Sequence, residues 1–439
     1  MLPTRGHFNP HVLHPLPHKW SVSSLRAPAL IGTPLILRIS NTDPGTLVVL
    51  AVLSLLPFLV SRLLTACLSK SKPVKQDLPQ EPLLYPADKD AAALSRNNKR
   101  RLASYPKGFP EGWYPLCFSD DLRKGDIKYI ECVGHELAVY RDESGVAKTV
   151  DAHCPHLGAN LAFGGTVIGD CIQCPFHLWQ FDGVDGACRS IPYCSPVPSV
   201  AKTRHWQTVD YYGLVCMFYS PRDEVRVSPP YQLMRIPAID SGEQVYRGRW
   251  EVPVKMHLQE FAENSVDFQH FQPLHGGMTI PFTDIPISFI TIRHVADWAE
   301  DPDHRHIVRF LDHATLMFRG REIPHSSAKA TITFQGPGGV VIFDFVTEVG
   351  KIVLVQSHAP LDSVNMQVRF TWFADRAIPR LLVSYVVGNW FAQWKRDVMV
   401  WENKIYLRKP LLVKGDGPVM KLRRWFAQFY AEETPSGDW

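Results

Sequence analysis

Two cysteines and two histidines form the pattern in this sequence with the clearest chemical meaning. Cys154 and His156 are separated by one residue, and after a gap of seventeen residues Cys174 and His177 are separated by two. These residues suit a [2Fe-2S] cluster in which the cysteines hold one iron and the histidines hold the other. Because neutral imidazoles replace two anionic thiolates, such a cluster has a raised potential. Electron transfer is therefore the first hypothesis.

The same four residues are also a possible zinc site, since zinc binds two cysteines and two histidines. Zinc fingers usually pair like with like, whereas each half of this site contributes one Cys and one His. The flanking segments read CPHLGA from Cys154 and CPFHLWQF from Cys174, and they are similar to those of Rieske centres. The sequence thus favours a Rieske cluster over zinc. Cys171 could form a redox pair with Cys174, but Cys174 is already needed for the cluster.

A second group of candidate ligands follows later in the chain. Asn264, Asp267 and His270 are spaced by three residues, and His275 lies five residues after His270. A helix beginning near Pro253 and ending before Pro273 would place the first three on one face, with His275 folding back towards His270. Two imidazoles and one carboxylate are the facial triad of non-haem Fe(II) oxygenases. Two histidines at this spacing are more often core or surface residues, but a Rieske site upstream favours a metal.

The carboxylate of this triad is expected in the helix-prone stretch from Arg380 to Leu407. Apolar and amide side chains recur there at spacings of three and four, which places Asp397 on an inward face. Glu402 falls on another side of the same helix. The alternative for Asp397 is a solvated partner of Lys395 or of the neighbouring Arg396.

Short strands are the elements that must position both sites. In the first half, turn residues separate runs rich in β-branched and aromatic residues, and this pattern predicts strands at 127–133, 136–140, 146–151 and 214–219. The second half predicts strands at 288–295, 307–311, 330–334, 340–346, 352–358 and 366–373. The fold class is therefore α+β: a small β Rieske [2Fe-2S] domain is followed by an antiparallel-sheet, helix-flanked catalytic domain. Its cavity can hold one small molecule. We expect Trp179, Phe181 and Pro175 to shield the cluster, although such aromatic residues also serve as ordinary core.

An apolar run near the N-terminus predicts a membrane anchor. Residues 46–68 contain a single charge, Arg62, and are long enough for one transmembrane helix. A signal peptide fits less well, because the run starts after more than forty residues and no small-residue cleavage site follows. Slightly more basic residues lie on the C-terminal side of the span than before it, and basic residues favour the cytoplasmic side. We therefore expect a single-pass protein of a membrane such as the endoplasmic reticulum, with a cytoplasmic catalytic part.

These features divide the chain into five parts. Residues 1–45 are expected to be a disordered leader, and 46–68 the transmembrane helix. A polar linker covers 69–104, the Rieske domain 105–222 and the mononuclear iron domain 223–439.

Composition excludes several other classes of protein. With 439 residues and 45% hydrophobic residues, the chain can build two cores. A net charge of +4 gives no support to nucleic-acid binding. Nine cysteines in this length are too sparse for a disulfide scaffold and indicate a reducing compartment.

Taken together, the two iron motifs and Asp397 resemble those of the Rieske-type non-haem iron oxygenases, over residues 105–430. The segments 397–404, 415–418 and 423–430 are similar to the steroid branch of that family. That branch includes bacterial 3-ketosteroid 9α-hydroxylases and animal Neverland-type cholesterol 7-desaturases. The predicted anchor, absent from the soluble bacterial enzymes, favours the Neverland type.

The resemblance implies a mechanism and partners. A separate reductase takes electrons from NAD(P)H and passes them to the Rieske cluster. They then reach a mononuclear iron held by His270, His275 and Asp397, where O2 is activated. The family usually forms a homotrimer, in which an aspartate matching Asp267 bridges a cluster histidine of one chain and an iron histidine of the next. Asn264 belongs to the same motif and is expected at the catalytic site.

The implied substrate is a sterol. In the Neverland type, hydrogens are removed from C7 and C8 of cholesterol, and 7-dehydrocholesterol and water form. Two alternatives remain open at this point: a steroid hydroxylase, which would leave oxygen in its product, and an electron carrier, which would need no second metal.

Overall fold

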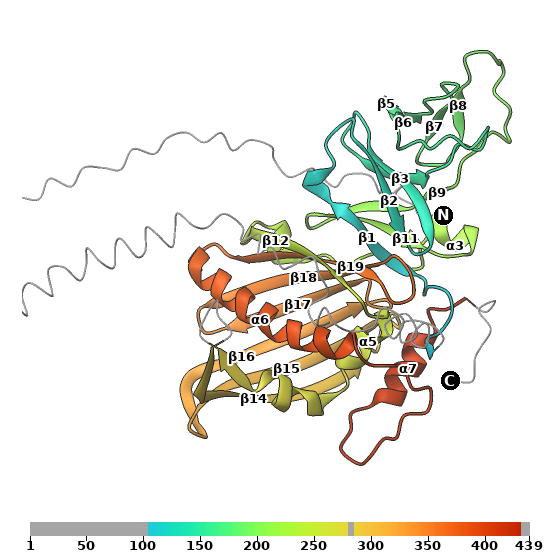
Figure 1. Cartoon of the computed structure of the whole chain (residues 1–439). Coiled ribbons are helices and arrows are strands. Elements are labelled where there is room, and N and C mark those ends of the chain that lie inside the picture. Colours follow the sequence, from blue (N-terminus) through green and yellow to red (C-terminus); the bar gives the residue numbers. More distant parts are fainter. Residues whose placement is uncertain (1–103, 280–284, 432–439) are drawn as a thin grey trace, which may run out of the picture. The chain divides into compact units, whose positions relative to one another are not determined.

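The computed structural model describes residues 104–279 and 285–431, which belong to one structural unit (Figure 1). The predicted leader, the anchor at 46–68 and nearly all of the linker lie outside these residues. Among the helices that the structure describes, none combines the length and the apolar character needed to cross a membrane.

Small β-sheets make up the first half of the described chain. One three-stranded sheet has the order β1-β11-β10, and two four-stranded sheets have the orders β2-β3-β4-β9 and β5-β6-β7-β8. The bounds are β1 Gly112–Phe118, β2 Ile127–Cys132, β3 His135–Arg141, β4 Ala147–Asp151, β5 Thr166–Ile168, β6 Cys171–Gln173, β7 Gln180–Asp182, β8 Cys188–Ser190, β9 His205–Trp206, β10 Thr208–Tyr211 and β11 Leu214–Tyr219. A 3-10 turn, η1 (Ser119–Asp121), follows β1, and the short helices α3 (Asp223–Val227) and α4 (Pro237–Asp240) lead into the second half.

An eight-stranded antiparallel sheet forms the second half, in the order β12-β19-β18-β17-β16-β15-β14-β13. Its strands are β12 Gln244–Val254, β13 Gly277–Thr279, β14 Pro286–Glu300, β15 Ile307–Phe318, β16 Arg321–Gln335, β17 Val340–Thr347, β18 Gly350–Pro360 and β19 Met366–Asp375. The helical elements are α5 (Leu258–Asn264), the 3-10 turn η2 (Phe268–His270), the π-helical turn η3 (Phe271–His275), α6 (Arg380–Trp401) and α7 (Val419–Ala427).

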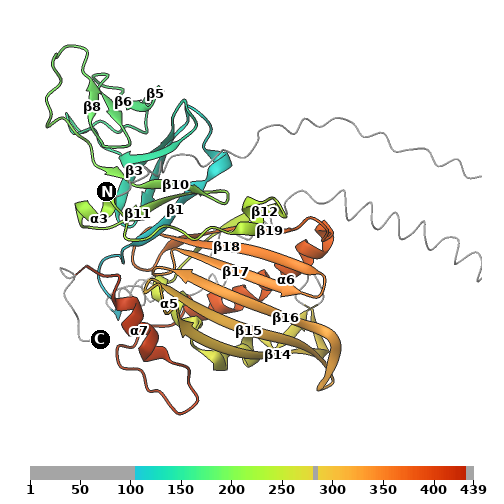
Figure 2. The ribbon, with the colours of Figure 1, turned by 180° about the vertical axis from the view of Figure 1, so that it is seen from behind.

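Helix α6 crosses one face of this sheet, and from behind the strands lie in front of it (Figures 1 and 2). Aromatic rings fill the space between helix and sheet. The ring centroid of Trp390 lies 5.1 Å from that of Phe343 and 5.6 Å from that of Phe370. Such pairs each add about 0.5–1.5 kcal/mol beyond the burial of their area. This packing fixes α6 over the sheet, and with it the side chains that α6 directs towards the strands.

One hydrophobic core continues from the first half into the eight-stranded sheet. Buried side chains of β1 and β11 share a cluster with those of β17 and β18, among them Trp113, Phe218, Val340 and Val355. The Val133 N–H also donates to the carbonyl of Pro360 (2.7 Å). The two halves are therefore packed together rather than tethered.

The predicted strands form, but the sheet of the second half extends further than expected. Residues predicted as 307–311 and 330–334 belong to the much longer strands β15 and β16. Strands β1, β5 to β10, β12 and β13 were not predicted. Helix α6 ends at Trp401, short of the predicted Leu407. Polar residues at alternate positions obscured the apolar pattern of the long strands, although a sheet with one solvated face tolerates them.

The predicted helix from about 253 to 272 is wrong. Pro253 lies in the edge strand β12, where a missing N–H is tolerated. The helix starts at Leu258, and its last turn tightens when the N–H of Ser265 bonds to the carbonyl of Ala262 (3.1 Å). Asp267 then leaves the helical conformation, and the wider π turn accommodates Pro273. π turns of this kind occur frequently at functional sites.

Candidate metal centres

The four residues of the predicted Rieske site lie on two loops of the same design. In each loop the N–H four residues after the cysteine donates back to the cysteine carbonyl: Gly158 to Cys154 (2.9 Å) and Leu178 to Cys174 (3.1 Å). Both donors have a positive φ, +73° at Gly158 and +59° at Leu178. Glycine adopts this conformation freely, whereas for leucine it costs about 1 kcal/mol. The second loop therefore has a strained backbone at Leu178 that the surrounding structure must stabilise, as is common in functional loops.

The side chains on these loops fit an iron–sulfur cluster. Cys154 and Cys174 are buried, and the imidazole centroids of His156 and His177 lie 4.6 Å apart. Nδ1 of His156 is buried and has no hydrogen-bond partner in the part of the chain that the structure describes. Burial raises the pKa of Cys154 to about 11, so a thiolate forms here when a cation compensates for its charge.

Of the three residues expected to shield the cluster, Trp179 stacks on a ligand. Its ring stacks on that of His156 at 4.5 Å and 8°. Phe181 is fully buried in the core of this lobe, and Pro175 is exposed. Trp179 therefore orients a ligand, whereas Phe181 serves as core.

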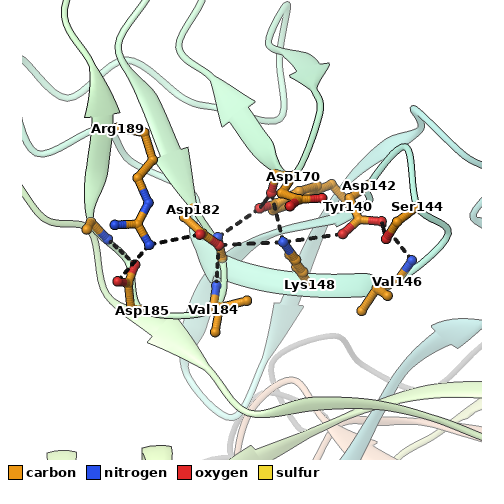
Figure 3. Close-up of polar contacts among 12 residues, drawn as sticks. Tyr140, Asp142, Ser144, Val146, Lys148, Asp170, Asp182, Val184, Asp185 and Arg189 are labelled. Carbon is orange, nitrogen blue, oxygen red and sulfur yellow. Dashed lines mark hydrogen bonds and ion pairs between the residues drawn. The ribbon is translucent and has the colours of Figure 1, made fainter. Parts of the chain in front are cut away.

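A buried charge network holds the strand that leads into the second loop (Figure 3). Nζ of Lys148 lies 3.3 Å from Oδ2 of Asp142 and 3.5 Å from Oδ1 of Asp182, and it donates to the backbone carbonyl of Asp170 (3.0 Å). Asp170 directly precedes β6, and Cys174 directly follows that strand. Lys148 thereby connects β4 to the strand that positions a cluster cysteine.

The second candidate centre brings together His270, His275 and Asp397. Oδ1 of Asp397 lies 3.1 Å from Nε2 of His275 and 3.9 Å from Nε2 of His270. One ligand atom from each residue falls within 4.8 Å of the other two, as a single metal ion requires. Oδ1 of Asp397 and Nδ1 of His275 are buried without a hydrogen-bond partner among the described residues. The three side chains fit the facial triad of non-haem iron.

The backbone around this centre sets which nitrogen of His270 is free. Nδ1 of His270 donates to the backbone carbonyl of Asp267, so Nε2 keeps its lone pair on the side of Asp397. Burial lowers the pKa of His270, although Asp397 opposes this shift, and the neutral imidazole is the form that binds metals. The amide Nδ2 of Asn264 lies 3.2 Å from Nε2 of His270. Asn264 and Asp267 thus both lie beside the ring of His270.

Helix α6 is tied directly to the turn that carries His275. The guanidinium of Arg396 donates to the carbonyl of Leu274 (2.7 Å). Asp397 is 5% exposed, so it is not a solvated partner of Lys395 or of Arg396. Glu402 lies elsewhere, where its carboxylate accepts from the N–H of Lys255 (3.0 Å).

Asp267 differs from the other residues of its motif because its side chain is 53% exposed. One carboxylate oxygen remains 3.9 Å from Nδ1 of His270. The segment before α7 packs against the loop that carries Asp267. The carbonyl of Val266 is so close to Gly417 that no Cβ would fit there. Asp267 therefore lies at the surface with its backbone fixed beside the iron site.

A cavity of about 350 Å³ opens onto the three ligands, within the usual range for pockets that bind one small molecule. Its sheet wall consists mostly of apolar side chains at alternate positions of β14 to β17: Ile292, Phe310, Ala314, Leu316, Ala328, Ala330, Ile332, Phe334, Phe343 and Phe345. Helix α6 contributes Tyr385, Asn389, Trp390, Gln393 and Trp394. Such a cavity suits a largely apolar ligand.

Two titratable residues of the cavity wall were not predicted. His294 and Asp312 line it from β14 and β15. The available signal was positional, because His294 alternates with Ile292 and Ala296 on the inner face of its strand, where a polar residue needs a reason.

Comparison with known proteins agrees with this arrangement. Residues 112–201 match the model of the Rieske [2Fe-2S] domain, and residues 222–430 match that of the 3-ketosteroid 9α-hydroxylase C-terminal domain. The chain is 37% identical over 347 residues to the cholesterol 7-desaturase nvd of Hemicentrotus pulcherrimus, covering 77% of this chain and 73% of that protein.

The chain belongs to the cholesterol 7-desaturase branch of the Rieske-type non-haem iron oxygenases. A cholesterol 7-desaturase of Caenorhabditis elegans is 36% identical, covering 76% of this chain and 80% of that protein. The oxygenase component of the 3-ketosteroid-9-alpha-monooxygenase of Rhodococcus rhodochrous is more distant, at 27% identity over 75% of this chain and 82% of that protein.

The fold is shared more widely. Dicamba monooxygenase bound to dicamba has a TM-score of 0.54 at 18% identity, covering 74% of this chain and 98% of that chain. Pseudomonas putida CBB5 NdmA with caffeine has the same score at 19% identity, covering 72% and 89%. This Rieske oxygenase is therefore an oxidoreductase that uses a [2Fe-2S] cluster and a non-haem iron, with electrons from NAD(P)H supplied by a reductase.

Proposed function

We propose that this enzyme converts cholesterol to 7-dehydrocholesterol, a step of steroid hormone biosynthesis. The supporting observation is the identity of 35–37% to relatives named cholesterol 7-desaturase, over most of both chains. Removing two hydrogens from cholesterol with one O2, two electrons and two protons gives the diene and two molecules of water. The matched catalytic domain is unnecessary for an electron carrier, so that alternative is set aside.

The chain's own residues have distinct tasks in this reaction. When bound, the cluster supplies electrons and the mononuclear iron supplies the activation of O2. His270, His275 and Asp397 hold the iron, and the turn η3 and helix α6 fix their directions. The apolar sheet wall excludes water and determines which C–H bond of the sterol lies beside the iron.

We also propose that the enzyme forms a homotrimer. The exposed carboxylate of Asp267, beside His270, supports a contact with a cluster histidine of a neighbouring chain. His156 and His177 are partly exposed, as such a contact requires. Electrons would then pass from the cluster of one chain to the iron of the next, and an isolated chain would be inactive.

We also propose that the chain is held at a membrane such as that of the endoplasmic reticulum, with its catalytic part in the cytoplasm. The support is the apolar run at 46–68 and the solubility of sterols in bilayers. Deleting the first 75 residues should impair activity in cells much more than activity on sterol dispersed in detergent. Equal losses in the two assays would contradict the role of the anchor.

Cholesterol deuterated at C7 and C8 tests the reaction itself. The full-length enzyme, loaded with both metals and supplied with a reductase, NAD(P)H and O2, should yield a diene that has lost deuterium from both carbons. A 7-hydroxy product that keeps the C8 deuterium would instead identify a steroid hydroxylase, the remaining alternative.

A further inference from the structure

His294 and Asp312 form a buried pair on the sheet wall of the sterol cavity. Nδ1 of His294 lies 2.8 Å from Oδ2 of Asp312, and each side chain is 9% exposed. In the antiparallel register His294 pairs with Ala314, and Asp312 pairs with Ala296, so the two are diagonal neighbours with small residues opposite them. Since the other side chains of this wall are apolar apart from Ser326, the pair is its one ionisable feature among the described residues.

The pair has hydrogen-bonding capacity that the described chain does not use. Nε2 of His294 and Oδ1 of Asp312 are both buried without a partner among the described residues. In the tautomer that carries its proton on Nδ1 and donates it to the carboxylate of Asp312, Nε2 has a lone pair and is an acceptor. Leaving such atoms unpaired costs about 1–3 kcal/mol each. The cavity therefore offers acceptors that need a donor from a ligand.

We propose that Nε2 of His294 accepts a hydrogen bond from the 3-hydroxyl group of the sterol, with Asp312 orienting the imidazole. This inference rests on the proposed function. A sterol has one hydroxyl donor on an otherwise hydrocarbon body, and the cavity pairs one acceptor group with an apolar wall. Conversely, a 3-keto group has no proton to donate, so the pair selects 3-hydroxysterols over 3-ketosteroids.

The position of His294 suits this role. Its ring centroid lies 6.5 Å from that of the iron ligand His275 and 5.1 Å from that of Phe271 on the same turn. In cholesterol the ring that carries the hydroxyl adjoins the ring that contains C7. A hydroxyl bound at His294 therefore presents the neighbouring ring towards the iron ligands, and His294 acts as a positioning residue that sets specificity.

The test compares cholesterol with cholest-5-ene, which has the same rings without the hydroxyl, and with cholest-4-en-3-one. In the full-length holoenzyme with its reductase, kcat/KM for cholesterol should exceed that for either analogue by about 10- to 100-fold. In His294→Phe the value for cholesterol should fall until the preference is within a few-fold of unity. His294→Gln restores an acceptor oxygen and should recover part of the preference.

The matched control is His313→Phe. His313 is the next residue after Asp312 on β15 and is exposed, so the same replacement there should leave the preference unchanged. Iron content and the EPR signal of the cluster must match the wild type in every variant that is compared. Binding to metal-free protein gives a second readout, because Trp390 and Trp394 line the cavity and their fluorescence should respond to bound sterol.

Failure of this inference differs from failure of the proposed function. If wild-type enzyme desaturates cholesterol but shows no preference in turnover and binding, the inference is wrong and the function stands. The inference is equally wrong if His294→Phe keeps the preference, or if Gln393→Leu on α6 abolishes it instead. If cholesterol is bound with the hydroxyl preference but never desaturated, the function fails and the inference holds. The wild-type comparison needs no variant, so a misfolded His294→Phe leaves the test intact.

Discussion

The carboxylate of Asp397 lies 3.1 Å from Nε2 of His275, although one residue is on a long helix and the other on a π turn far earlier in the chain. The contact exists because α6 crosses the sheet on the same side as η3, where Arg396 bonds to the carbonyl of Leu274. Two negatively charged candidates, Asp397 and Glu402, are only five residues apart, and this geometry distinguishes them.

Asp397→Ala should abolish turnover and reduce the mononuclear iron content to near zero, while the Rieske EPR signal persists. The reason is that the triad loses its one anionic ligand. Glu402→Gln is the matched control, since it keeps an acceptor for the N–H of Lys255 and should retain iron. An active Asp397→Ala enzyme beside an inactive Glu402→Gln enzyme would show that Glu402, and not Asp397, is the iron ligand.

Cys154→Ser and His156→Ala should each remove the cluster and all activity, because serine and alanine cannot replace a thiolate or an imidazole as iron ligand. Low-temperature EPR of the reduced protein measures the loss. Cys171→Ser, at another buried cysteine of the same lobe, should keep the signal. A normal Rieske signal in both ligand variants would reject the assignment.

Asp267→Asn should retain both metals and slow electron transfer from the cluster to the iron. The carboxylate is exposed and is not an iron ligand, so its loss alters the bridge between chains rather than the site. Rapid single-turnover oxidation of the reduced cluster would measure the transfer, and a wild-type rate in the variant would count against the bridging role.

Lys148→Met should destabilise the cluster-binding lobe by about 3 kcal/mol, because it leaves the nearly inaccessible carboxylate of Asp142 without its cation. Loss of the cluster's visible absorbance during denaturant titration measures the effect. Arg189→Gln is the control: that guanidinium is half-exposed in its pairs with Asp182 and Asp185, and its removal should cost less than about 1 kcal/mol. Equal effects would refute the special role of Lys148.

Buried histidines predict how stability depends on pH. Burial lowers the pKa of His358 and of His257 to about 3, whereas an unfolded histidine has a pKa of about 6.5. Below about pH 6.5 the unfolded chain binds more protons, so stability falls as the pH drops and continues to fall to about 3.

Between pH 6.5 and pH 5 each of these histidines should lower the free energy of unfolding by about 2 kcal/mol. His358 is fully bonded in its neutral form, with Nδ1 donating to the carbonyl of Gly338 (2.7 Å). Unfolding of His358→Gln by denaturant should therefore depend less steeply on pH than that of the wild type, and the exposed His313→Gln should behave as the wild type. An unchanged slope in His358→Gln would contradict the prediction.

Local sequence was enough to predict features whose physical cause is also local. The spacing of Cys154, His156, Cys174 and His177 follows from two short loops that each carry two ligands, so their pattern is visible without a fold. Strands with a clear apolar character, such as β11, were predicted with their observed bounds because they are buried on both faces.

Only the tertiary structure determined the features that depend on distant segments. The end of helix α5 at Asn264 reflects packing and backbone bonds around η2 and η3, which override the helical spacing of the motif. The pairing of His294 with Asp312 depends on the register of β14 against β15, because a shift of one strand by one residue would place the two side chains on opposite faces of the sheet. The sequence therefore determined which metals the chain can bind, whereas the fold determined what the cavity beside them can recognise.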